Sequence, residues 1–198
     1  MLLKGVIDKN ITHETDKKNQ NRILGYIFEW AETVLIALCT VILVFTFLFR
    51  TVTVDGTSML NTLKHNDNVI ISNLAYTPET GDIVVLRVPG YSQPLIKRVI
   101  ATGGQHLVID FDNWRVTVDG EVLDESYVRY IKGASMHTLG SPNPLDIVVP
   151  EGTVYVMGDN RNGSNDSRNP SIGTVDERYI LGRVILRFAP FSSFGVVK

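Results

Sequence analysis

The sequence predicts a mostly β protein, with an antiparallel sheet or barrel-like body and a small second lobe, preceded by one transmembrane helix. Three observations support this prediction. An uncharged apolar run occupies residues 33–49, short runs of β-branched residues separated by turn residues follow it, and no long amphipathic helical pattern appears after residue 50. Without such helices βαβ units are not expected, so the strands should pair antiparallel.

The composition of the 198 residues indicates a compact body of single-domain size behind the apolar run. The formal net charge is -2 and no long run of one sign occurs, so nucleic-acid binding is not expected. The single cysteine, Cys39, excludes an intrachain disulfide and a cysteine-based zinc site. The four histidines lack the i, i+4 spacing of two ligands on one helix face, so no metal is expected.

The apolar run at residues 33–49 contains 17 residues and is followed at once by Arg50. Its length is near the minimum that crosses about 30 Å of hydrocarbon, and the weakly polar residues before it can lengthen the helix. Residues 29–50 are therefore predicted to span the membrane. A buried core helix is disfavoured because core helices rarely lack polar residues on every face, and a cleavable secretory signal because the run is too long and too far from the N-terminus.

Basic residues on either side of this span predict its direction. Five precede it, and only Arg50 follows it closely. We expect residues 1–28 to be cytoplasmic and residues 51–198 to form an extracytoplasmic β-rich domain of a single-pass cell-membrane protein, with the lipid bilayer as a partner. The preceding basic residues are Lys4, Lys9, Lys17, Lys18 and Arg22.

Runs of β-branched residues after residue 50 predict the strands of the body. The dipeptide Asp119-Gly120 between two such runs is a strong two-residue hairpin signal. Residues 126–146 alternate poorly and hold Gly140 and two prolines, so they are predicted to form either the small second lobe or a mobile loop. The predicted strands cover residues 51–54, 68–72, 82–88, 95–102, 106–111, 114–118, 121–124, 146–150, 153–157 and 180–188.

The segment VDGTSML, residues 54–60, holds a candidate nucleophile, Ser58. A serine close to glycine in a turn directly after a strand can expose its hydroxyl, and nearby backbone N–H groups can hold an oxyanion. Taken alone, an ordinary turn is the simpler interpretation, because serine and small residues are common in turns.

The segment LIKRVIATGG, residues 95–104, holds a candidate base, Lys97. Alternation along a strand places Lys97 on the same face as Leu95 and Val99. A lysine with the ordinary pKa of about 10.4 is neutral in only about one molecule in two thousand at pH 7, but desolvation by apolar neighbours lowers the pKa and makes it a workable proton acceptor. The alternative is a lysine whose stem packs while its amine reaches water.

The segment GDNRNGSNDSR, residues 158–168, is too rich in polar and small residues to be core. A solvated loop is one interpretation, and a calcium-binding loop is another. The twelve-residue calcium pattern does not fit, since its acidic last ligand is lacking and two arginines would repel the ion. A hydrogen-bonded, ion-paired loop that positions neighbouring groups fits the composition better.

Together and in this order, these segments resemble the sequence boxes of bacterial type I signal peptidases. The matching motifs are SML behind a membrane span, GDIVVL, KRVIATGG and GDNRxxSxDSR, and they extend to Arg168. The resemblance implies a membrane-bound serine endopeptidase that removes signal peptides from exported preproteins by a Ser-Lys dyad, without a cofactor. Lysine at position 97 resembles the bacterial and organellar members, and the short chain, the single anchor and Gly56 resemble the Gram-positive members in particular.

The resemblance also implies a role for individual residues. Ser58 matches the nucleophile and Lys97 the general base. Ser164 matches the serine that orients the lysine amine, and Gly158 matches a glycine that leaves room beside it. Four charged residues match those that hold the framework of the site by ion pairing, namely Arg98, Asp159, Asp166 and Arg168.

The chain departs from some members of that family at two places. Where those members have a serine that donates to the oxyanion, this chain has Gly56. The oxyanion hole must then use the Ser58 backbone N–H and whatever Thr57 or another backbone donor supplies. The segment SRNPSIGTV carries two more residues than the shortest members, which we interpret as a loop extension.

An apolar groove beside Ser58 is expected to bind an extended substrate by strand addition. Plain core packing is the alternative for each lining residue. Because Ser58 lies nine residues past Phe49, even an extended chain keeps it within roughly 30 Å of the end of the span. The predicted lining residues are Val52, Val54, Met59, Leu63, Leu95 and Ile96.

Three other functions compete with this interpretation. A catalytically inactive relative acting as a membrane-anchored assembly factor typically lacks the serine or the lysine, and both are present here. A self-cleaving repressor-type Ser-Lys protease needs a DNA-binding domain where the membrane span lies. A Ser-His-Asp hydrolase would have to use His65 or His106, and neither lies in a recognisable site motif.

Overall fold

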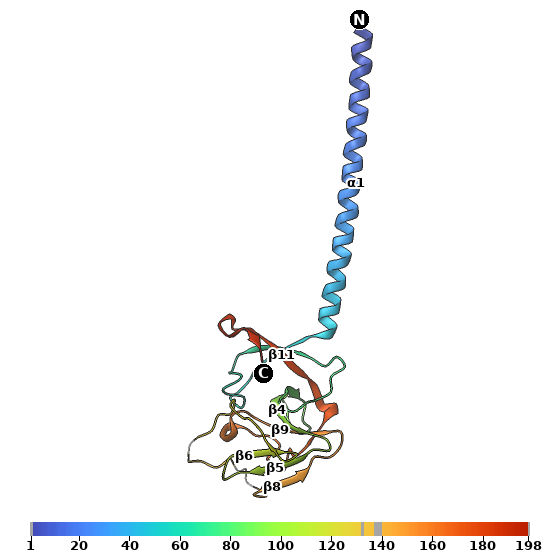
Figure 1. Cartoon of the computed structure of the whole chain (residues 1–198). Coiled ribbons are helices and arrows are strands. Elements are labelled where there is room, and N and C mark those ends of the chain that lie inside the picture. Colours follow the sequence, from blue (N-terminus) through green and yellow to red (C-terminus); the bar gives the residue numbers. More distant parts are fainter. Residues whose placement is uncertain (1, 132, 137–139, 198) are drawn as a thin grey trace. The chain divides into compact units, whose positions relative to one another are not determined.

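The computed structural model of the chain describes residues 2–131, 133–136 and 140–197. The chain divides into two compact units, Met1–Phe47 and Leu48–Lys198. The first unit is helical, and every strand of the described chain belongs to the second (Figure 1). The predicted fold class, a mostly β body preceded by one apolar helix, is confirmed.

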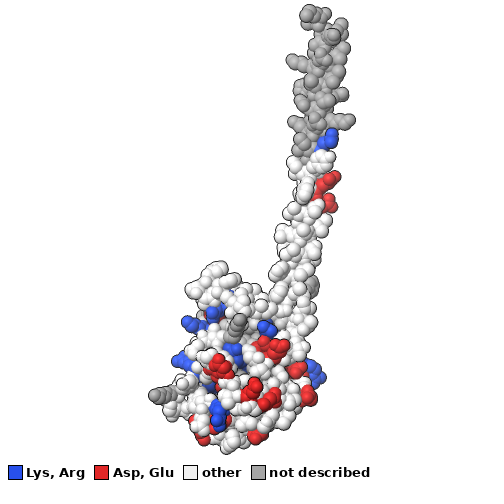
Figure 2. Space-filling view, viewed as in Figure 1, with Lys and Arg blue, Asp and Glu red and all other residues white. Residues whose placement is uncertain are grey.

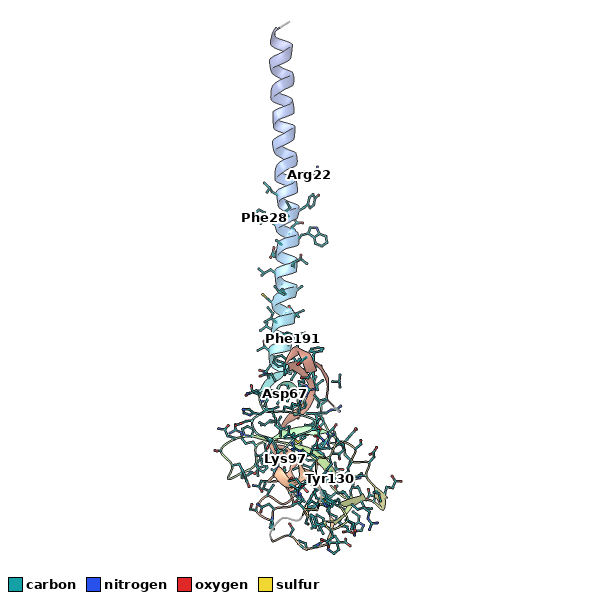
Figure 3. All side chains as sticks on the ribbon, turned by 90° about the vertical axis from the view of Figure 1, so that its left-hand side faces the viewer. Arg22, Phe28, Asp67, Lys97, Tyr130 and Phe191 are labelled. Carbon is teal, nitrogen blue, oxygen red and sulfur yellow. The ribbon has the colours of Figure 1, made fainter. Side chains whose placement is uncertain are left out.

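Helix α1 (Leu2–Leu48) contains a stretch long and apolar enough to cross a membrane, Leu24–Thr46, with a mean hydropathy of 2.1. None of this stretch is buried, and the side chain of Phe28 projects outward from the helix (Figure 3). The sequence has no charged residue from position 33 to the end of the helix at Leu48, and the described helix surface near the body is white in Figure 2. A helix with apolar side chains on all sides suits a lipid environment.

Within the described residues, eight strands form the main sheet, and all of its pairs are antiparallel. The ten-residue strand β11 pairs with three neighbours and shifts register three times, and such bulges bend and twist a strand, so the sheet curls. Across the sheet the strands are β1 (Arg50–Thr53), β2 (Asn68–Ser72), β11 (Ile180–Ala189), β3 (Ile83–Leu86), β4 (Leu95–Thr102), β9 (Thr153–Met157) and β10 (Val175–Asp176), with β12 (Gly195–Val196) also paired to β11.

A second antiparallel sheet of four strands, counted over the same described ranges, forms the other layer. Asp119 and Gly120 both have positive φ, at 52° and 84°, which is the turn that a tight hairpin requires, and the predicted hairpin is confirmed. The order across this sheet is β7 (Glu121–Val122), β6 (Arg115–Val118), β5 (His106–Asp110) and β8 (Leu145–Val148). Three short 3₁₀ helices complete the described elements, η1 (Arg161–Gly163), η2 (Glu177–Tyr179) and η3 (Phe191–Ser193).

Residues 126–146, predicted to form either the small second lobe or a mobile loop, lie mostly between the strands of this sheet. Its strands come from residues 106–122 and 145–148, so the segment between them is a connection that contributes only the start of β8. The described part of the connection is irregular apart from an isolated bridge between Arg129 and Asn160. Apolar and polar residues do not alternate along this segment, so as a strand it would have no apolar face to bury.

Strand β4 connects the three apolar clusters of the core. Ile96 packs beside β1 and β2, Val99 packs with β3 and β9, and Ile100 packs between the two sheets. All residues from Ile96 to Ala101 are buried, so both faces of β4 are covered. The core therefore fixes β4 on each side, and with it the side chain of Lys97.

Candidate active site

Ser58 lies in a turn that follows β1 and is anchored by buried apolar side chains. Met59 and Leu63 are 1% and 0% exposed, and the Leu63 N–H donates to the Met59 carbonyl at 2.8 Å. Gly56 adopts a φ of +98°, a conformation that favours glycine, and its N–H donates to Nδ1 of His65 at 3.2 Å. The hydroxyl of Ser58 is thereby held at the surface of the core.

Lys97 extends from β4 to the same point. Its Nζ lies 2.9 Å from Ser58 Oγ and 3.0 Å from the carbonyl oxygen of Ile96. The residue is 3% exposed and lies within the body, among packed side chains (Figure 3). The structure thus brings together the two residues predicted as nucleophile and base, although they are 39 positions apart in the chain.

The pKa of Lys97 is lowered to about 8, chiefly by burial; the charge of Asp166 opposes the shift, that of Arg168 adds to it, and that of Asp159 opposes it. A neutral amine at this position can accept the hydroxyl proton of Ser58 and donate to the Ile96 carbonyl at the same time. The arrangement therefore suits proton transfer from Ser58 to Lys97 near pH 8.

Gly158 packs against the Ser58 turn so closely that a side chain has no room. A Cβ at this position would lie 2.2 Å from Ser164 Oγ and 2.6 Å from the carbonyl oxygen of Ser58. The Ser164 hydroxyl oxygen is buried near Asp166, whose pKa it helps to lower, and it makes no hydrogen bond to the lysine amine within the described chain. The contact between Ser164 and the lysine amine, which the family resemblance implies, is therefore not formed here, and the amine donates to the Ile96 carbonyl instead.

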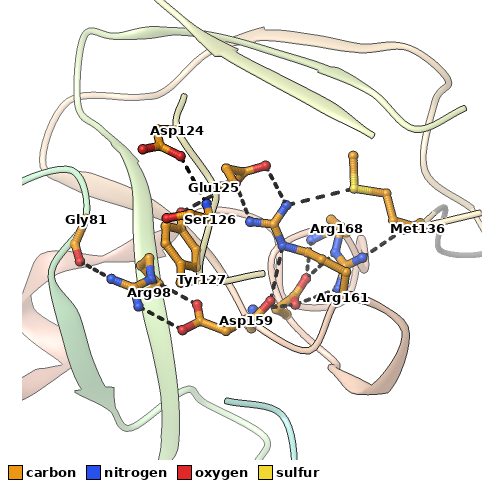
Figure 4. Close-up of polar contacts among 12 residues, drawn as sticks. Gly81, Arg98, Asp124, Glu125, Ser126, Tyr127, Met136, Asp159, Arg161 and Arg168 are labelled. Carbon is orange, nitrogen blue, oxygen red and sulfur yellow. Dashed lines mark hydrogen bonds and ion pairs between the residues drawn. The ribbon is translucent and has the colours of Figure 1, made fainter. Parts of the chain in front are cut away.

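Two of the predicted framework residues, Arg98 and Asp159, form a buried ion pair with two hydrogen bonds, from Nε to Oδ1 at 2.9 Å and from Nη2 to Oδ2 at 2.8 Å. Nη1 of Arg98 donates to the carbonyl of Gly81, and the ring of Tyr127 stacks under the guanidinium at 3.8 Å (Figure 4). The hydroxyl of Thr62 donates to Asp159. This pair therefore joins β4, the turn of Ser58 and the loop that follows β9.

The other two framework residues, Asp166 and Arg168, pair through two hydrogen bonds of 2.8 Å each. The backbone N–H of Gly158 adds a third bond to the carboxylate at 2.8 Å. Burial alone raises the pKa of Asp166, but the contacts with Arg168 and Gly158 outweigh it, and the pKa lies below its usual range. A permanently charged pair thus closes the loop beside Gly158.

Sequence reasoning missed a third ion pair, between the buried Arg161 and the partly buried Glu125 (Figure 4). Although burial by itself lowers the pKa of Arg161, the contact with Glu125 raises it overall. Nε of Arg161 donates to the carbonyl of Gly158 at 3.2 Å, so this pair supports the same loop. The arginine belongs to a predicted motif, but its partner is 36 positions away in a segment without a pattern.

A pocket of about 140 Å³ opens beside Ser58 and Lys97. Five of the six predicted groove residues line it, whereas Leu63 is completely buried in the core and does not. The polar side chains of Asp55 and Gln93 also line the pocket. The five predicted residues are Val52, Val54, Met59, Leu95 and Ile96.

Strand β1 forms one wall of this pocket and lies at the edge of the main sheet. Across the described strands it pairs with β2 alone, so its other side is unpaired. An unpaired strand edge can hydrogen-bond an added extended peptide.

A Ser-His-Asp hydrolase would need His65 or His106 beside Ser58. Within the described chain, neither histidine forms a hydrogen bond with the Ser58 hydroxyl. Nδ1 of His65 lies 3.3 Å from Asp55 Oδ1 and accepts the Gly56 N–H. Nε2 of His106 lies 2.7 Å from Asp146 Oδ1 in the second sheet. Neither histidine therefore takes the place of Lys97 beside Ser58.

Comparison with known proteins agrees with the motif order. A family model for signal peptidase, peptidase S26, matches residues 27–189. Signal peptidase IB of Staphylococcus aureus (strain COL) is 33% identical over 181 residues, which cover 85% of this chain and 92% of the relative. Probable signal peptidase I-1 of a Synechocystis strain is 35% identical over 183 residues, which cover 86% of each chain.

A crystal structure of a signal peptidase I from Enterococcus faecalis V583 is 25% identical in sequence, with a TM-score of 0.45 over 55% of this chain and 97% of that chain. The family match extends over most of the sequence, and the two relatives cover this chain almost throughout. The chain belongs to the signal peptidase family, peptidase S26.

Proposed function

We propose that this chain is a membrane-anchored serine endopeptidase that removes signal peptides from exported preproteins, with Ser58 as nucleophile and Lys97 as general base. The observation that carries the proposal is the 2.9 Å contact between Ser58 Oγ and the buried Lys97 amine. The proposal that signal peptides are the substrate is supported by membership of the signal peptidase family and by relatives named signal peptidase.

The reaction begins with Lys97 neutral. Ser58 Oγ attacks the carbonyl carbon at the end of the signal peptide while its proton passes to Lys97 Nζ. The tetrahedral intermediate collapses, and the lysine returns the proton to the leaving amine of the mature protein. A water molecule then attacks the acyl carbon while one of its protons passes to the same amine. The ester bond to Ser58 Oγ breaks, Oγ takes the proton back from Lys97, and the signal peptide leaves with a new carboxyl group.

In this proposal, backbone N–H groups stabilise the negative charge of the tetrahedral intermediate by hydrogen bonds. Gly56 has no side chain that can donate, so the backbone N–H of Ser58 is the first donor, and Thr57 lies next to it in the turn. Ser164 remains a proposed support for the lysine amine, because its hydroxyl is buried next to Gly158, which packs against the Ser58 turn.

The buried ion pairs hold the reacting groups in place without taking part in proton transfer. Arg98 with Asp159 ties β4 to the Ser58 turn through Thr62, and Asp166 with Arg168 fixes the backbone of Gly158. Each carboxylate is satisfied by its arginine, so neither competes as a base.

The signal peptide is proposed to bind as an extended strand along the free edge of β1, with its side chains entering the pocket. The pocket is small and mostly apolar in its lining, which suits small uncharged residues before the scissile bond. A bulky residue would exceed the space, and a charged residue would lose its hydration there.

The proposed topology has residues 1–28 in the cytoplasm and residues 51–198 on the extracytoplasmic side. The excess of basic residues before the apolar stretch supports this direction. A protease added outside intact cells should digest the body and spare the N-terminal segment; the opposite pattern would refute the topology.

The decisive experiment incubates the purified protein in detergent with a preprotein whose residues one and three before the cut are alanine. We expect cleavage at that single site by the wild type and no cleavage by Ser58→Ala. A matched preprotein with a bulky residue directly before the cut should remain intact. A wild-type protein that cleaves neither substrate would favour the alternative, a membrane-anchored assembly factor without activity.

A further inference from the structure

Asn160 holds the turn of the nucleophile at two successive carbonyl groups. Its side-chain Nδ2 donates to the Thr57 carbonyl at 3.0 Å, and its backbone N–H donates to the Ser58 carbonyl at 2.9 Å. These carbonyls belong to the peptide units on either side of the Ser58 Cα. Asn160 therefore bonds both peptide planes that determine the backbone dihedral angles of Ser58, and at Thr57 it adds to a longer bond of 3.3 Å from the Leu60 N–H within the turn.

The side-chain contact has a particular consequence for the Ser58 N–H. A trans peptide unit is planar, with its C=O and N–H pointing in opposite directions, and the Thr57–Ser58 bond is trans. Fixing the Thr57 oxygen therefore fixes the direction of the Ser58 N–H on the other edge of the plane. That N–H makes no hydrogen bond to any residue that the structure describes, so it remains available to a ligand.

The backbone of Asn160 is itself held firmly. Arg129 bridges it from the segment after β7, with its N–H donating to the Asp159 carbonyl at 2.8 Å and its carbonyl accepting from the Arg161 N–H at 3.1 Å. The Asn160 side chain therefore extends to the Ser58 turn from a backbone position that hydrogen bonds hold in place.

The loop also leaves the Asn160 amide free for this contact. Asn160 occupies the N-cap position of η1, where asparagine commonly caps the helix, yet its side chain makes no capping hydrogen bond. Gly163 provides the space, because a Cβ there would lie 2.5 Å from Nδ2 and 3.0 Å from Cγ of Asn160. The conformation of the amide therefore depends on glycine at position 163.

We infer that the Asn160 side chain is a positioning residue for the oxyanion hole: it holds the Thr57 carbonyl so that the Ser58 N–H faces the developing oxyanion. The inference rests on the proposed function and adds a residue to that site. Asn160 acts through the peptide unit of Thr57 and Ser58, and it neither touches substrate nor transfers a proton.

The test compares Asn160→Ala with Gly163→Ala, which keeps the amide but crowds it. Losing an oxyanion-hole donor costs about 10²- to 10³-fold in kcat, so misdirecting one should lower kcat for preprotein cleavage by about 10- to 100-fold in both variants. KM and the midpoint of the pH profile should stay unchanged, because Lys97 and the pocket keep their contacts. The control is Asn162→Ala, whose amide bonds Ile131 and Ser135 instead and which should retain wild-type kcat.

A pair of ligands separates positioning from general damage. In a substrate-like peptide aldehyde, Ser58 Oγ bonds to the carbonyl carbon, and the former carbonyl oxygen becomes a hemiacetal oxygen held in the oxyanion hole; the serine proton ends on that oxygen or on Lys97. The matched peptide alcohol binds the groove without forming this bond. Aldehyde affinity should fall by about the factor lost in kcat, while alcohol affinity should match the wild type.

Wild-type kcat and aldehyde affinity in both variants would overturn the inference, as would an equal fall in aldehyde and alcohol affinity, which would assign Asn160 to the groove. Thermal unfolding of each variant identifies one that fails to fold, and the other then decides. A wild-type protein that neither cleaves preprotein nor binds the aldehyde would instead defeat the proposed function.

Discussion

The base and the nucleophile of this site are held by different kinds of structure. Lys97 projects from the middle of β4, which is paired with β3 and β9 and buried on both faces. Ser58 lies in a turn outside the sheet, and its backbone is held by hydrogen bonds from Asn160 and by the buried side chains around it.

The difference teaches what each side of the site controls. Burial in the packed sheet is the largest influence on the protonation of Lys97, and the charges of Asp166 and Arg168 modify it. The Ser58 turn depends on a few directional contacts, so substitutions at uncharged positions of the loop from residue 158 to residue 168, such as Asn160, should alter geometry without altering the pKa of the base. Substitutions that separate protonation from geometry test this contrast.

The largest effect is expected from replacing either reacting group. Ser58→Ala and Lys97→Arg should each lower the rate of preprotein cleavage by about 10⁴-fold or more. Arginine keeps the positive charge but cannot release its proton in a protein, so it cannot serve as the base. Cleavage assays with equal amounts of folded protein check this; a Lys97→Arg protein with near wild-type activity would exclude the dyad.

Breaking one framework pair should mainly affect stability. Asp166→Asn leaves the buried Arg168 without its counter-charge and should destabilise the fold by about 3–5 kcal/mol in urea unfolding. The exposed pair of Asp176 and Arg178 provides the control, because Asp176→Asn removes a carboxylate whose partner is largely in water and should unfold like the wild type. Equal midpoints for the two variants would contradict the role of the buried pair.

Removing the amine should stabilise the protein while abolishing its activity. The pKa of Lys97 lies about 2.5 units below that of an exposed lysine, and each unit corresponds to about 1.4 kcal/mol, so Lys97→Met should gain about 3 kcal/mol at pH 7. Below pH 8 both the folded and the unfolded wild type bind the proton, so the gain is complete there. It should shrink between pH 8 and pH 10.5, where the folded wild type has already released its proton.

Unfolding curves of both proteins across that pH range measure the gain. Lys64→Met is the control, since Lys64 is exposed and its removal relieves no burial. If Lys97→Met gains no stability at pH 7, or gains more as the pH rises, then burial does not disfavour the charged form of the Lys97 amine.

The smallest expected effect is a shift in the pH dependence of kcat/KM, which reports on the protonation of Lys97 and not on the geometry of the Ser58 turn. Activity requires neutral Lys97, so kcat/KM should rise about tenfold per pH unit up to a midpoint near 8 and then level off. Asp166 raises the pKa of Lys97, so Asp166→Asn should move the midpoint to lower pH. A flat profile from pH 6 to pH 10 would contradict a lysine base.

Much of the fold followed from local pattern. Strands β2, β4 and β9 begin and end where their runs of β-branched residues were predicted to, because turn residues flank each run. Strands β10 and β12 were not predicted, since two residues leave no period to detect. The burial of both faces of β4 was also missed, because it depends on which layers cover the strand and not on the alternation within it.

The site was predictable where motifs carry it and not where distant residues complete it. Ser58 and Lys97 were identified from the order of the motifs, since neither segment is decisive alone. Glu125 and Thr62 meet their partners across 36 and 97 positions, and a single sequence holds no trace of such pairing. Leu63 was assigned to the groove because it follows Ser58 closely, but the turn directs it into the core.

The unpaired edge of β1 also exposes the protein to unwanted association. An edge that hydrogen-bonds an extended signal peptide can hydrogen-bond the edge of another copy or an unfolded chain, which is how sheet proteins aggregate. Two features limit that risk here: β1 has only four residues, and charged Arg50 and Asp55 lie at or just beyond its ends, both exposed. Short length and flanking charge are the protections that open edges commonly carry, so an edge left open for a substrate need not attract every strand it meets.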